Sequence, residues 1–90
     1  MCTWVTMSTE VEGSGKGPEG EWITVTDARV YFDHPQHSPM NHALMVDLVD
    51  RDGGPSARVA IELNTTSARR LVEAIESALS VVDERVLADS

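Results

Sequence analysis

Residues 57–82 read ARVAIELNTTSARRLVEAIESALSVV, and the spacing of apolar residues changes within this stretch. Over residues 57–63 alternate side chains are apolar, as in a strand with one buried face: Ala57, Val59, Ile61 and Leu63. Farther along, apolar residues recur at steps of three and four, which is typical of an amphipathic helix: Ala68, Leu71, Val72, Ile75, Leu79 and Val82. The stretch therefore predicts a strand followed by a helix over about residues 66–83, with Thr65 or Thr66 as the N-cap.

Three further segments rich in β-branched residues precede this stretch and predict three more strands: residues 2–11, 22–32 and 43–49. The apolar phase changes within the second of them, which predicts a one-residue bulge near Thr26 and Asp27. A glycine-rich hairpin loop is expected at residues 12–21 and a histidine loop at residues 33–42. Because consecutive strands usually pair, the fold class predicted is α+β: a four-stranded antiparallel meander with one C-terminal helix packed on one face.

Size and charge restrict the functions that the chain can carry. Its 90 residues predict one small domain with a thin hydrophobic core. Seven basic against 15 acidic residues give a formal net charge of −8, which argues against nucleic acid and anionic membranes as partners. No apolar run approaches the roughly 20 residues that span a bilayer, and the N-terminus lacks the pattern of a signal peptide. A single cysteine forms no intramolecular disulfide, so a cytoplasmic location is expected.

One helix covers one face of a sheet, and the other face would carry Trp4, Met45 and Val49. We interpret these residues as a candidate homodimer surface, because a small core gains from association. The alternative is that they are scattered surface apolar residues, which are common in soluble proteins.

The segment DHPQHSPMNH, residues 33–42, contains every histidine of the chain. If the second and third strands pair, His34 and His42 flank the mouth of this loop and His37 can fold over it. The first strand would begin beside the end of the second, which brings Cys2 to the same end of the sheet. The only thiol and the three imidazoles are therefore expected to converge.

Three interpretations of this cluster stay open. In the first, Cys2, His34, His37 and His42 bind zinc or copper, with Met40 favouring Cu(I), and the role is structural rather than catalytic. In the second, Cys2 is a metal-free nucleophile with a histidine as general base, in a small-molecule site. In the third, the histidines are solvated loop residues or interface contacts and Cys2 is a small buried apolar residue. The rival function is then a non-catalytic interaction module, whose open sheet face or acidic surface binds a protein partner.

Four phrases of the sequence resemble a family of small actinobacterial proteins of unknown function: MCT at the start, GSGKG, VYFDHPQH and GPSARVAIEL. The resemblance covers most of the chain and implies a bacterial cytoplasmic protein. It implies no activity, so no catalytic or binding residue is transferred from it. Trp4 departs from the tyrosine that is usual in the family, a difference that concerns packing.

Overall fold

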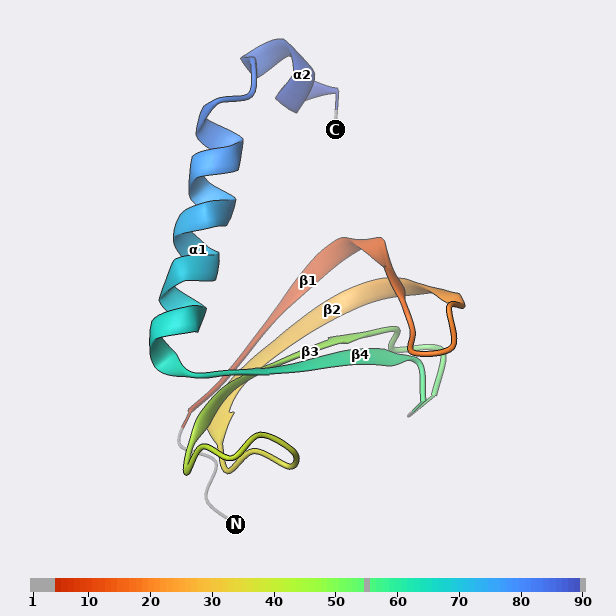
Figure 1. Cartoon of the computed structure of the whole chain (residues 1–90). Coiled ribbons are helices and arrows are strands. Elements are labelled where there is room, and N and C mark those ends of the chain that lie inside the picture. The colour runs from red at the N-terminus through yellow and green to blue at the C-terminus, as the bar shows by residue number, and fades with distance from the viewer. Residues whose placement is uncertain (1–4, 55, 90) are drawn as a thin grey trace.

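Four antiparallel strands form one sheet in which the strands lie in sequence order (Figure 1). The computed structural model describes residues 5–54 and 56–89. The strands are followed by two helices, and the elements are β1 (Val5–Lys16), β2 (Trp22–Asp33), β3 (Ala43–Val49), β4 (Arg58–Leu63), α1 (Thr65–Ser80) and α2 (Glu84–Ala88). The predicted α+β meander with a C-terminal helix is confirmed.

The β1–β2 hairpin is longer and more bent than the sequence pattern suggests. β1 continues through Lys16, so the connection is residues 17–21 instead of 12–21. The irregularity expected in β2 lies in β1, where the register shifts between Glu10 and Gly13. The alternation of β2 alone could not show which of the two paired strands carries the extra residue.

The two faces of the sheet differ in chemistry. One row crosses all four strands on the apolar face, through the pairs Met7–Val30, Val30–Val46 and Val46–Ile61. The next row lies on the opposite face, which we call the polar face, and consists of Thr6, Tyr31, Met45 and Glu62. The buried apolar residues are few, as the length predicts: Val25, Ala28, Ala43, Met45 and Val49.

Met45 and Val49 do not form an exposed dimer surface, and that prediction is wrong. Met45 is 5% and Val49 7% exposed. The loop between β2 and β3 folds against this side of the sheet, where Gln36 and His37 line a hollow together with Met45. Trp4, the third residue of the predicted surface, lies outside the described residues.

Helix α1 begins one residue before the predicted range and ends earlier. Its N-cap is Asn64, whose side-chain oxygen accepts the backbone N–H of Ser67 at 2.7 Å, so neither threonine is the cap. After Ser80 the chain turns and Asp83 caps the short helix α2 by accepting the backbone N–H of Arg85. The predicted helix therefore ends at Ser80, and the cap at Asp83 begins a second helix that the sequence pattern did not predict.

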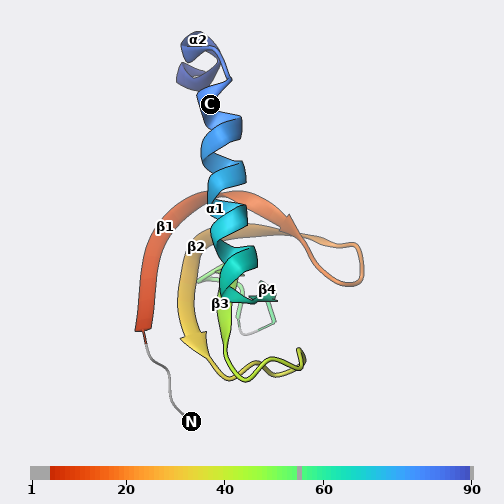
Figure 2. The same ribbon diagram turned by 60° about the vertical axis from the view of Figure 1, so that its left-hand side comes forward.

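The helices project beyond the sheet in both views of the chain (Figures 1 and 2). None of the residues described in α1 and α2 is buried. The Cα radius of gyration is 14.7 Å, against about 12 Å for a compact domain of this length. Much of the amphipathic helix therefore has no partner within its own chain.

Candidate functional site

Two of the three histidines meet where the sheet ends. His34 follows β2 and His42 precedes β3, and their ring centroids are 4.7 Å apart. His42 also stacks on Phe32, with centroids 5.8 Å apart and an interplanar angle of 11°. The Nδ1 atom of His34 lies 2.9 Å from the carbonyl oxygen of Asn41. The predicted approach of His34 and His42 across the loop mouth is therefore present.

His37 is held on the polar face by its backbone. The carboxylate of Glu62 accepts the backbone N–H groups of Gln36 at 2.6 Å, Ser38 at 3.0 Å and His37 at 3.3 Å. One side chain of β4 thereby fixes the middle of the histidine loop. The hydrogen bonds from Ser38 and Gln36 hold the pKa of Glu62 below its usual value of 4.5, since they stabilise the charged form.

The described residues contain no group of three or more His, Cys, Asp and Glu side chains placed to hold a metal ion. His37 therefore does not complete such a group with His34 and His42. Cys2, the fourth predicted ligand and the predicted nucleophile, lies outside the described residues. The geometry brings two of the four candidate ligands together.

We expect Glu62→Gln to free the histidine loop. The substitution removes the charge that binds three backbone N–H groups, so amide hydrogen exchange at residues 36–38 should accelerate relative to intrinsic rates. Because the folded pKa of Glu62 is lowered, protection of these amides in the wild-type protein should persist at neutral pH and be lost as the pH falls below 4.5. Glu73→Gln, at an exposed position of α1, is the control. Unchanged exchange in Glu62→Gln would contradict this role.

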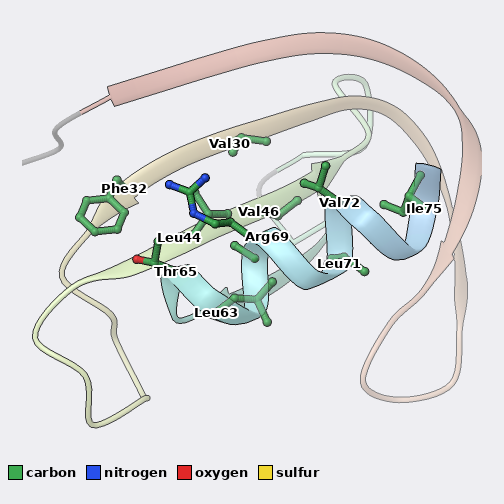
Figure 3. A pocket seen from close by; sticks show the side chains of 11 residues that line it. Val30, Phe32, Leu44, Val46, Leu63, Thr65, Arg69, Leu71, Val72 and Ile75 are labelled. Atoms are coloured by element: carbon green, nitrogen blue, oxygen red, sulfur yellow. The ribbon is translucent and has the colours of Figure 1, made fainter. Parts of the chain in front are cut away.

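A second candidate site is an apolar hollow of about 430 Å³ between α1 and the apolar face (Figure 3). Strands β2 to β4 and the first turns of α1 contribute its walls. The residues on which the argument below depends are Val30, Phe32, Leu44, Val46, Leu71 and Ile75. Leu71 and Ile75 remain 42% and 52% exposed, so the hollow is open rather than filled by the chain itself.

The sequence matches the model of a family described as a family of unknown function, DUF6295, over residues 1–88. The chain belongs to this family. The match agrees with the resemblance to a family without assigned activity. Searches of the curated proteins and of the solved structures gave no match.

Among the described residues of this DUF6295 protein, no helix has both the length and the apolar character needed to cross a membrane. The longer helix, α1, has 16 residues. Its polar side carries Arg70, Glu73 and Glu76, whereas Arg69 borders the apolar hollow (Figure 3).

The polar face of the DUF6295 protein also carries a charged network. The hydroxyl of Tyr31 donates to Oδ2 of Asp47 at 3.1 Å, and Nη1 of Arg58 lies 3.4 Å from the same oxygen. Asp47 is 7% exposed, so the two neighbours compensate a nearly buried carboxylate. Burial raises the pKa of Tyr31 above its usual value of 10.0, and the negative charge of Asp47 adds to that effect.

We expect an alkaline titration of Tyr31 with a midpoint above 10.0. Its phenol is the only one in the sequence, so the ultraviolet absorbance of the phenolate is assigned without ambiguity. Asp47→Asn should lower the midpoint, because it removes the nearby negative charge and leaves burial as the principal cause. Circular dichroism over the same pH range shows whether the fold persists. Equal midpoints in the two proteins would exclude electrostatic coupling between Tyr31 and Asp47.

Sequence reasoning missed two parts of this arrangement. Glu62 alternates with Ile61 and Leu63, which places it on the polar face but gives no sign that its partners are at residues 36–38. The pairing of Tyr31 with Asp47 across β2 and β3 follows from the strand register, in which Tyr31 is opposite Met45. Both contacts depend on exactly which residues pair between neighbouring strands. The sequence pattern predicts the order of the strands but not this register.

Proposed function

We propose that this protein is a non-catalytic interaction module that forms a homodimer through α1 and the apolar face. One observation carries the proposal: α1 is amphipathic over 16 residues, yet none of them is buried. Most helical stability in proteins comes from packing of such an apolar face, because an isolated helix of this length is marginal in water. The helix is therefore expected to bury its apolar side against another chain.

The exposed area supports an interface of ordinary size. The accessible surface of the chain is 7002 Å². A compact monomer of 9.8 kDa exposes about 5,200 Å², so the excess is roughly 1,800 Å². A standard interface buries about 800 Å² on each partner. A dimer can thus cover the hollow and α1 with the area that this chain leaves open.

Sedimentation equilibrium tests the proposal directly. The wild-type protein should sediment with twice the mass of the chain and dissociate only on dilution. A single species with the mass of one chain, at every concentration that can be measured, would overturn the homodimer.

Metal binding is a second candidate function, favoured by the contact between His34 and His42. A carbonyl oxygen only accepts hydrogen bonds, so the Nδ1 atom of His34 that faces Asn41 carries the proton. The Nε2 lone pair of His34 is then available, in the arrangement by which a backbone carbonyl commonly orients a metal-binding imidazole. Zinc or copper would be held by His34 and His42, with Cys2 as a further predicted ligand and without His37, which does not join the other two histidines.

Elemental analysis of protein reconstituted with zinc or copper tests this second function. We expect one metal ion for each chain, and its loss in His34→Ala, His42→Ala and Cys2→Ser. His37→Ala is the informative comparison, because the backbone of His37 is bound to Glu62 on the polar face. Protein that stays metal-free after reconstitution, with an unchanged melting temperature, would contradict metal binding.

A further inference from the structure

The apolar stripe of α1 is symmetric about Ile75. Leu71 and Leu79 lie four residues to either side of it. A twofold axis at Ile75 would pair the helix with an antiparallel copy of itself. It would place Leu71 against Leu79 of the second copy. Such self-complementarity is what an isologous interface requires.

Charges along the helices favour the same orientation. Basic residues occupy the first turns of α1, at Arg69 and Arg70, and α1 has no basic residue in its last turn. The acidic residues Asp83 and Glu84 follow its C-terminal end, where Nε of Arg85 lies 3.5 Å from Oδ1 of Asp83. An antiparallel copy brings the basic end of each helix to the acidic end of the other, whereas a parallel copy opposes like charges. Antiparallel pairing also offsets the unfavourable position of two arginines at a helix N-terminus.

The hollow provides a place for the second helix. It lies between the first turns of α1 and the apolar face, so a helix seated in it contacts both (Figure 3). The distal part of α1, by contrast, extends past its own sheet (Figures 1 and 2). Leu79 there is 54% exposed. If each copy places the distal part of its α1 in the hollow of the other copy, both the hollow and the exposed part of α1 are covered.

We propose that the α1 helices of two copies lie antiparallel, and that α1 of each copy fills the apolar hollow of the other. This inference rests on the proposed homodimer and specifies its geometry. The interface then joins the helix stripe to Val30, Phe32, Leu44 and Val46 of the other copy's sheet. The twofold axis passes near Ile75, midway along the stripe.

Single-cysteine crosslinking in a Cys2→Ser background tests the geometry. Ile75→Cys should form a disulfide-linked dimer under mild oxidation, because the two copies of residue 75 meet at the axis. Leu79→Cys alone should not, since two copies of residue 79 would be displaced by about 12 Å along the helices, beyond disulfide reach. A mixture of Leu71→Cys and Leu79→Cys chains should crosslink. Ser77→Cys, on the polar side of the stripe, is the control that reports random collision.

Charge reversal gives a second measurement. Arg69→Glu with Arg70→Glu should raise the dissociation constant of the dimer roughly tenfold. Adding Glu84→Lys to the same chain should restore part of the affinity, and Asp83 is left in place because it caps α2. A dimer in which both residues 75 and 79 crosslink to themselves would show parallel helices and overturn this inference. A dimer in which neither crosslinks would place the interface elsewhere, which overturns this inference and the proposed use of α1 and the apolar face, but not dimer formation. A monomer would overturn the proposed function itself.

Discussion

The Leu79→Glu variant is expected to be a monomer at concentrations at which the proposed wild-type dimer forms. Leu79 lies on the apolar stripe of α1 and is 54% exposed within its own chain. The substitution therefore removes little packing from the single chain. In the dimer, the introduced carboxylate would be buried in an apolar contact. A twofold interface contains residue 79 of both copies, so this cost arises twice.

The size of the effect follows from burial. Completing the burial of a half-exposed leucine contributes about 1–1.5 kcal/mol, and two copies contribute roughly 2–3 kcal/mol before any desolvation of the carboxylates. The dissociation constant should therefore rise at least about thirtyfold. Sedimentation equilibrium measures the change, and circular dichroism checks that the sheet is retained.

Ser77→Glu is the matched control for Leu79→Glu. It introduces the same charge into the same helix, two residues away, on the side opposite the stripe. The dimer should persist in this variant. If both glutamates dissociate the dimer equally, charge alone is responsible, and the stripe is not the interface. If neither does, the two copies associate through another surface.

The order of elements was predictable because each has its own period. Ile61 and Leu63 alternate in β4, whereas Leu71, Ile75 and Leu79 repeat at four residues in α1, so the change from strand to helix is visible in the sequence. The position of the helix relative to the sheet was not predictable. Periodicity identifies an apolar face and does not say whether that face is covered by its own chain or by another one.

The candidate site was also predictable only in part. Pairing of β2 with β3 was enough to bring His34 to His42, because both residues adjoin the strand ends. His37 was expected to join them, but Glu62 binds the backbone of the loop from a strand that is distant in sequence. A contact of this kind depends on the register between β3 and β4, which places Glu62 opposite Met45.

Gly15→Val should destabilise the protein more than any other change in the β1–β2 hairpin that we propose. A Cβ atom at Gly15 would lie 3.2 Å from Cγ2 of Val59 and 3.3 Å from Cγ2 of Val25. The bent end of the hairpin approaches β4 at this point, so a larger side chain forces the two apart. Overpacking of this kind costs about 1–3 kcal/mol of unfolding free energy, which corresponds to a decrease of roughly 5–20 °C in melting temperature.

Gly13→Val is the matched control for Gly15→Val, because a Cβ atom at Gly13 meets nothing within 4 Å. Valine is favoured over glycine in strands, so this variant should unfold at the wild-type temperature or slightly above it. Both variants are measured at one protein concentration, since the proposed dimer would make the melting temperature depend on concentration. Equal destabilisation by the two valines would mean that bending of β1, which both glycines permit, matters more than the contact with Val59. A selective loss at Gly15 would show instead that this contact between the hairpin and β4 holds the curved sheet together.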